Sequence, residues 1–147
     1  MKLTIAWIGK TKNPAIQSLT DEYLRRLKQY CEAEGMPLKD EASLSRSSGR
    51  DGRSTRRHLV LLDPRGKHLS SEELAEFLRT HQERNPQPIL FAIGPADGFS
   101  ENARNQADFT LSLGKMTIAH ELARIILLEQ LYRAFTILKG HPYHLGH

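Results

Sequence analysis

The sequence predicts an α/β domain in which a mainly parallel sheet is covered by helices on both faces. Short apolar runs at residues 3–8, 58–62 and 88–93 have the length of strands, and segments with helical spacing lie between them. Strands that are apolar without alternation are buried on both faces, which is typical of parallel sheets. No repeat and no linker divides the 147 residues, so we expect a single domain over residues 1–147.

The first part of the chain predicts a strand, a helix and a basic loop. After the strand at 3–8, Asn13 caps a helix and Pro14 occupies its first position, and apolar spacing continues this helix to residue 30. Residues 36–44 are a weaker candidate for an edge strand. Residues 46–57 contain five arginines, three serines and two glycines against one acid. This composition predicts a flexible basic loop that is either solvated or bound to RNA phosphates.

The second half of the chain predicts two capped helices and then a long terminal one. Ser70 and Glu73 have the spacing of a capping box, and Ser100 caps a weaker helix. The remaining predicted elements are strands at 88–93 and 109–113, a loop at 112–119, a helix at 121–138 and a tail that Pro142 turns away from this helix.

Composition and charge limit the kind of partner and compartment. The net charge is +4 and the pI is near 9.4, which favours an anionic partner, with nucleic acid as the first choice. The lone Cys31 excludes an internal disulfide and suits a reducing compartment. The apolar run at 3–8 is too short for a signal peptide, and charged residues interrupt 122–138, which excludes a membrane span. We therefore expect a cytoplasmic protein without membrane contact.

The terminal helix combines an apolar circumference with ionisable side chains. Its apolar residues cover the full circle at 100° per residue: Leu122, Ile125, Ile126, Leu127, Leu128, Leu131, Phe135 and Leu138. Such a helix is expected to be buried on all sides, and since a small sheet cannot cover it completely, we expect a homodimer. Buried ionisable groups must be paired or used. Glu129 and Arg133, at i and i+4, therefore form either a structural ion pair or part of a site, and His120 is a further candidate.

Glycine-containing loops follow three predicted strands, at 62–66, 93–98 and 112–117. In open α/β sheets ligands bind at the carboxyl ends of the strands, so these loops predict a ligand site. His141, His144 and His147 are spaced by three, but no flanking acid or cysteine completes a metal site. We therefore predict no bound metal.

Seven stretches of the chain, in order, match one family, at residues 8–14, 22–27, 62–63, 91–98, 112–120, 129–134 and 141–144. The chain resembles the small SPOUT methyltransferases of the ribosomal RNA large subunit methyltransferase H type. The resemblance implies a trefoil knot at the C-terminal end, a homodimer, and S-adenosylmethionine as the methyl donor. It also implies a substrate on the ribosome: a pseudouridine in helix 69 of 23S ribosomal RNA, methylated at N3.

The resemblance also assigns residues to roles by their positions. The cofactor-binding residues it implies are Leu62, Gly94, Pro95, Gly114, Lys115, Met116, Thr117, Ile118 and Ala119. The residues it places at the RNA base are Glu129, Arg133, Tyr143 and His144. Either the carboxylate or the imidazole of this second group is able to accept the imide proton, with Arg133 steadying the anion.

Two departures from the family pattern define an alternative function. The family usually has a second glycine at Pro95, and it carries a helix between Lys39 and His58 where this chain has a loop too short to hold one. A proline removes a backbone donor. The alternative is therefore a SPOUT-like RNA-binding homodimer without methyltransferase activity.

Overall fold

A computed structural model describes residues 1–95 and 97–146 and contains one five-stranded parallel sheet. The strand order is β2-β1-β4-β3-β5. The strands are β1 (Lys2–Ile8), β2 (Glu32–Leu38), β3 (His58–His68), β4 (Ile89–Ile93) and β5 (Phe109–Ser112). The helices are α1 (Pro14–Leu27), α2 (Ser43–Ser47), α3 (Ser71–Arg84), α4 (Glu101–Gln106), α5 (His120–Leu138) and α6 (Tyr143–Gly146).

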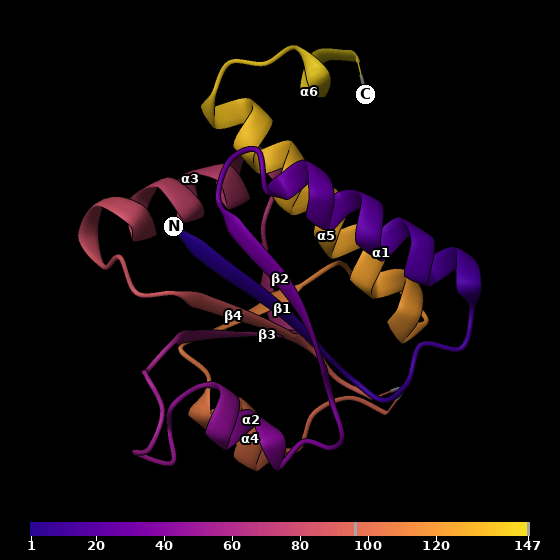
Figure 1. The fold of residues 1–147 in the computed structure, drawn as a ribbon, viewed down its shortest axis with the longest axis vertical. Coiled ribbons are helices and arrows are strands. Elements are labelled where there is room, and N and C mark those ends of the chain that lie inside the picture. The colour runs from indigo at the N-terminus through magenta and orange to yellow at the C-terminus, as the bar shows by residue number, and fades with distance from the viewer. Residues whose placement is uncertain (96, 147) are drawn as a thin grey trace.

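Helices cover both faces of the sheet, which confirms the predicted fold class. The long helices α1, α3 and α5 lie on one face, and the short helices α2 and α4 lie together on the other (Figure 1). Two hydrophobic clusters fill the space between the layers. Leu3, Ile5 and Phe91 belong to the first cluster, whereas their strand neighbours Leu90 and Ala92 belong to the second. Side chains alternate across a strand in this way, so both faces of the sheet are buried.

The edge strand β2 lies earlier in the chain than expected. It spans Glu32–Leu38 rather than 36–44, and it pairs only with β1 among the described residues. Pro37 is tolerated because an edge strand leaves one row of backbone donors without ladder partners. The preceding helix α1 ends at Leu27, three residues earlier than the spacing predicts.

The prediction of a flexible basic loop at 46–57 is wrong in part, and the region between Lys39 and His58, predicted to be too short for a helix, contains the single-turn helix α2. The single-turn helix α2 buries Leu44 in the second hydrophobic cluster. Arg50 donates to the carbonyls of Gln106 and Arg57 and pairs with Asp108, so it links this segment to β5. Of the other arginines in residues 46–57, the exposed ones are Arg46, Arg53 and Arg56.

The terminal helix α5 is not buried on all sides within one chain, which agrees with the expectation that a small sheet cannot cover its whole apolar circumference. Leu122 is 54% exposed and Ile126 is 37% exposed. Arg124 is only 1% exposed; its guanidinium stacks on Trp7 at 3.9 Å and donates to the Thr20 hydroxyl at 3.2 Å. The pKa of Arg124 is lowered because burial removes water from its charged guanidinium. No helix in the described part of the chain is long and apolar enough to cross a membrane.

The segment after the straight part of β3 crosses close to β5. Both Leu62 and Lys67 pair with Leu111, so residues 63–66 bulge out of the ladder. A Cβ atom added at Gly66 would lie 2.6 Å from the Thr110 carbonyl oxygen, so only glycine allows this approach. The trefoil knot that the family resemblance implies stays a prediction.

Candidate active site

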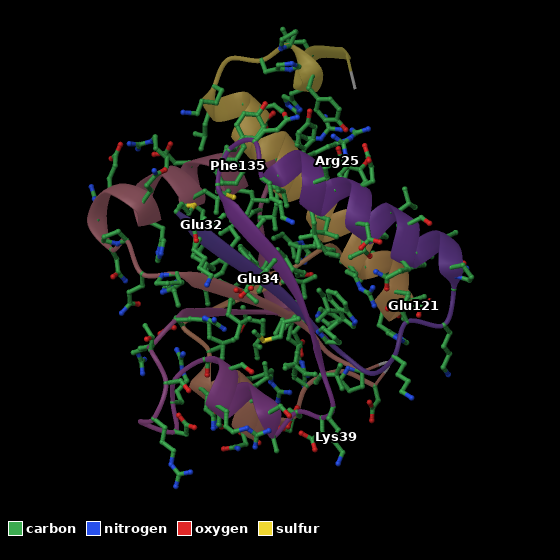
Figure 2. All side chains as sticks on the ribbon, viewed as in Figure 1. Arg25, Glu32, Glu34, Lys39, Glu121 and Phe135 are labelled. Carbon is green, nitrogen blue, oxygen red and sulfur yellow. The ribbon has the colours of Figure 1, made fainter. Side chains whose placement is uncertain are left out.

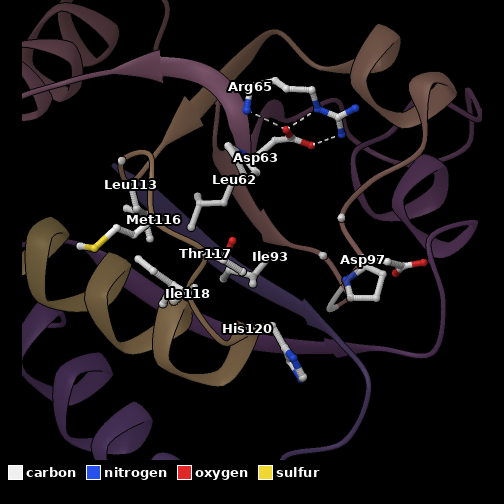
Figure 3. A pocket seen from close by; sticks show the side chains of 16 residues that line it. Leu62, Asp63, Arg65, Ile93, Asp97, Leu113, Met116, Thr117, Ile118 and His120 are labelled. Carbon is white, nitrogen blue, oxygen red and sulfur yellow. Dashed lines mark hydrogen bonds and ion pairs between the residues drawn. The ribbon is translucent and has the colours of Figure 1, made fainter.

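A cavity of about 400 Å³ lies at the bulge of β3, at the carboxyl end of β4 and beside the loop that follows β5 (Figure 3). The three loops predicted to hold a ligand all contribute to its wall. Seven of the nine residues assigned to the cofactor line it: Leu62, Gly94, Pro95, Gly114, Met116, Thr117 and Ile118. The other two, Lys115 and Ala119, are exposed and are not among the lining residues.

The cavity wall also contains residues that the sequence reasoning did not assign to it. They are Asp63, Pro64, Arg65, Ile93, Asp97, Gly98, Leu113, His120 and Ala123. Most of them belong to the three loops, so their positions in these loops could have predicted that they line the cavity. His120 opens α5 directly after the third loop and lines the edge of the cavity, with its imidazole directed away from Leu62 and Thr117 (Figure 3).

Glycines and one serine shape the backbone around the cavity. Gly114 has φ +128° and Gly98 has φ +84°, conformations that other residues rarely adopt. The Ser112 hydroxyl accepts from Gly114 N at 3.1 Å and donates to Gly114 O at 3.0 Å, which fixes the turn. A Cβ atom at Gly94 would lie 2.9 Å from the buried ring of Phe99. The cavity is therefore formed by backbone that only small residues allow.

A buried carboxylate holds an arginine at one side of the cavity. The Asp63 side chain is 0% exposed, whereas the Arg65 side chain is 57% exposed. Arg65 Nε and Nη2 donate to the two carboxylate oxygens at 2.8 Å each, and its backbone N–H donates at 2.9 Å. These hydrogen bonds hold the pKa of Asp63 below its ordinary value. Arg65 is thus positioned by a bidentate pair.

A second group of polar side chains lies where α5 meets the tail. Arg133 donates to both oxygens of Glu129, from Nε at 3.2 Å and from Nη2 at 2.9 Å, and the Tyr143 hydroxyl donates to Glu129 at 2.8 Å. Arg133 Nη1 also lies 3.0 Å from His144 Nδ1. The structure therefore brings together all four residues predicted to face the RNA base, which are called the tail network below.

Hydrogen bonding sets the protonation of the tail network. Burial and the hydrogen bond to Glu129 raise the pKa of Tyr143 to about 12. Because an arginine only donates, His144 Nδ1 must accept, and Nε2 then carries the hydrogen that points to Glu72 Oε1 at 2.7 Å. Both ring nitrogens of His144 are thus engaged. The imidazole thus presents a donor to the solvent side.

The cavity and the tail network lie at different ends of α5. None of Glu129, Arg133, Tyr143 and His144 lines the cavity. Arg133 follows His120 by thirteen residues, which is roughly 20 Å along a helix at 1.5 Å per residue. Figure 2 shows the same separation, with Glu121 at one end of α5 and Phe135 near the other. Within one chain, these side chains do not reach the cavity.

The described histidines of the tail, His141 and His144, form hydrogen bonds with protein atoms. The backbone N–H of Tyr143 donates to His141 Nδ1 at 3.1 Å, and His144 has the contacts described above. In residues 1–95 and 97–146 no group of three histidine, cysteine or acidic side chains is arranged to hold a metal ion. His147 lies outside the described residues.

Known proteins resemble the chain over its full length. A family model described as "Predicted SPOUT methyltransferase" matches residues 1–144. Ribosomal RNA large subunit methyltransferase H of Koribacter versatilis is 54% identical over 147 residues, which is 100% of both chains. The protein of the same name from Geotalea daltonii is 41% identical over 98% of this chain and 99% of the relative.

Solved structures share the fold at low sequence identity. A probable methylase family protein from Haemophilus influenzae Rd KW20 matches with a TM-score of 0.59 and 15% identity, over 96% of this chain and 69% of that chain. The SpoU methyltransferase AviRb from Streptomyces viridochromogenes, in complex with AdoMet, has a TM-score of 0.52 and 14% identity, over 90% of this chain and 57% of its own. The chain belongs to the SPOUT methyltransferases, in the family of ribosomal RNA large subunit methyltransferase H.

Proposed function

We propose that this protein transfers a methyl group from S-adenosylmethionine to N3 of a pseudouridine in helix 69 of 23S ribosomal RNA. The names of its relatives support a large-subunit RNA substrate, and the fold neighbour in complex with AdoMet supports the methyl donor. The observation that carries the proposal is the cavity, because all three loops expected to hold the donor meet there.

The cavity fits the donor in size and chemistry. Its volume of about 400 Å³ falls in the range of small-molecule pockets. Leu62, Ile93 and Ile118 offer apolar surface for a flat ring, and the glycine backbone offers close polar contacts. When bound, the donor supplies an electrophilic methyl group on a sulfonium. The residues of the chain then need chiefly to hold the acceptor nitrogen in line with that methyl group.

A homodimer would bring the tail network to a cavity. Reacting atoms must approach to about 3–3.5 Å, and the network of one chain lies too far from its own cavity. A symmetric dimer presents the same patch of each protomer to its partner. Leu122 and Ile126, which lie one turn apart on α5 and are 54% and 37% exposed, provide apolar surface for such a patch. We place the tail of one protomer over the cavity of the other.

Within the tail network, Glu129 is the better candidate for accepting the N3 proton. Arg133 occupies the one lone pair of the His144 ring, so His144 is left as a hydrogen-bond donor. Its contact with Glu72 is exposed and easily exchanged for a carbonyl of the base. Glu129 is the carboxylate of the tail network, and its oxygens accept from Arg133 and Tyr143. Arg133 would then stabilise the anionic base.

The test is methyl transfer from labelled S-adenosylmethionine to ribosomes and to free 23S RNA that lack the modification. We expect one methyl group per ribosome, mapped to the helix 69 pseudouridine by mass spectrometry of RNA fragments. Calorimetry should give micromolar binding of S-adenosylmethionine. No heat at millimolar cofactor, with RNA binding retained, would instead favour the RNA-binding dimer, for which Pro95 in the cavity wall is the supporting observation.

A further inference from the structure

Two arginines from different elements converge on one carbonyl oxygen beside the cavity. Arg65 on β3 places Nη2 at 3.4 Å from the Phe99 oxygen, and Arg104 on α4 donates to the same oxygen from Nη1 at 2.7 Å. The Phe99 ring is buried in the core, so this carbonyl is a fixed point. The two guanidinium groups therefore lie on either side of one oxygen.

Two positive charges lie close together at this place, and only one of them has a direct carboxylate partner among the described residues. Asp63 is the carboxylate that pairs with Arg65, and Arg104 has no carboxylate within ion-pair distance in the described part of the chain. Asp97 lines the same cavity but forms no ion pair with either arginine among the described contacts. Arg65 is thus paired with Asp63, and the nearby Glu41 carboxylate accepts from the N–H and hydroxyl of Ser100. Arg104 is the cation without a direct carboxylate partner among the described residues, and such a cation favours an added anion.

The outward side of Arg65 is directed to solvent rather than into the cavity. Its guanidinium lies beyond Asp63, on the side away from Leu62, Thr117 and Ile118 (Figure 3). Nε and Nη2 are used by Asp63 and Phe99, which leaves Nη1 free to donate. A planar guanidinium with a fixed orientation is well suited to a phosphate oxygen.

We infer that Arg65 and Arg104 bind a backbone phosphate of the RNA substrate at the mouth of the cavity. This inference rests on the proposed function and adds to it a contact outside the four residues of the tail network. Asp63 is then a positioning residue, because it touches the arginine and not the RNA. This phosphate contact would fix the position of the RNA strand relative to the cavity, at the side opposite α5.

The test compares charge-neutralising variants in ribosome binding over a range of salt concentrations. Arg104→Gln keeps a donor for the Phe99 carbonyl and removes the charge, and Arg65→Gln removes the second charge. Arg84→Gln is the matched control, because Arg84 is exposed at the end of α3, near the amino ends of the strands. The probe is the ribosome that lacks the methyl group, at constant Mg²⁺.

Each of the two variants should lower the magnitude of the log–log salt slope by about 0.7–0.9, and the control should leave it unchanged. Affinity for S-adenosylmethionine should stay at the wild-type value in Arg104→Gln, because Arg104 does not line the cavity. An unchanged slope in Arg104→Gln overturns the inference, even if Arg65→Gln fails to fold because Asp63 loses its partner. Reduced cofactor affinity with an unchanged slope would assign the arginines to the carboxylate of the donor and also overturns it.

Failure of the proposed function is recognised separately. A wild-type protein that methylates the ribosome while both variants keep its salt slope contradicts only the phosphate contact. A wild-type protein that neither binds nor methylates the ribosome contradicts the proposed function, and the inference falls with it.

Discussion

The cavity and the tail network use α5 in opposite ways. The cavity at the start of the helix is open and is built from backbone, glycines and apolar side chains. The tail network at the other end is closed, since its donors and acceptors are engaged with one another. An open pocket is preformed for a small ligand, whereas a closed network must exchange contacts when a partner arrives. The two regions therefore have separable functions, which the following predictions test.

The largest effect should come from removing the tail. Deleting residues 141–147 should abolish methyl transfer while leaving the dimer and most of the affinity for S-adenosylmethionine, because no residue of this segment lines the cavity in the described structure. Methyl transfer, calorimetry and light scattering measure the three properties. Full activity of the shortened chain would refute the role of the tail, and a monomeric product would show that the tail is structural.

Neutralising the carboxylate of the tail network should have the next largest effect. Glu129→Gln should lower the rate of methyl transfer by about 10²–10⁴ if Glu129 accepts the proton. His144→Ala should lower it by about tenfold, the cost of one lost hydrogen bond. Glu76→Gln on α3, an exposed pair partner of Arg79, is the control. A larger loss in His144→Ala than in Glu129→Gln would reverse the assignment of the base.

A change at the cavity should affect the cofactor and not the tail network. In Gly94→Ala the new methyl group would lie 2.9 Å from the Phe99 ring, and overpacking of this kind costs about 1–3 kcal/mol. We expect affinity for S-adenosylmethionine to fall by roughly tenfold to a hundredfold, measured by calorimetry. Gly146→Ala is the control, because this glycine has open space around it, does not have a left-handed φ and does not line the cavity. Unchanged cofactor affinity in Gly94→Ala would place the donor elsewhere.

The smallest effect concerns the titration of Tyr143. Its pKa is raised to about 12 in the folded chain from an ordinary value of 10.0, so the folded state holds the proton more tightly. The stabilisation is complete below pH 10 and is lost as the pH rises toward 12. Denaturation from pH 9 to 12 should show this loss in the wild type and a smaller loss in Tyr143→Phe. Identical pH dependence in both proteins would mean that the hydroxyl is not held by Glu129.

Local sequence rules predicted the helix starts because the groups involved are close in the chain. The side chains of Asn13, Ser70 and Ser100 accept the expected backbone N–H groups, at separations of two or three residues. The same rules failed for Arg50, which composition placed in a solvated loop. Its partner Asp108 is 58 residues away, and no local pattern reveals such a pairing.

Which residues of α5 are exposed also depends on tertiary packing. Periodicity shows that the helix is apolar all round, but the number of neighbours that cover it depends on the packing of α1 and α3. Within one chain these helices bury Leu127 and Leu131 and leave Leu122 and Ile126 exposed. The same packing buries Arg124 against Trp7, a contact between helix and strand that spacing does not encode.

The sequence by itself determined the alternation of strands and helices, the helix caps, the three loops and the family. These depend on patterns within a few residues or on motifs that keep their order along the chain. Only the tertiary structure decided which loop residues face the cavity, that Asp63 orients Arg65, and that the tail network closes on itself away from the cavity. Those relations arise from the sheet order and from the length of α5, which set distances between residues that are remote in sequence.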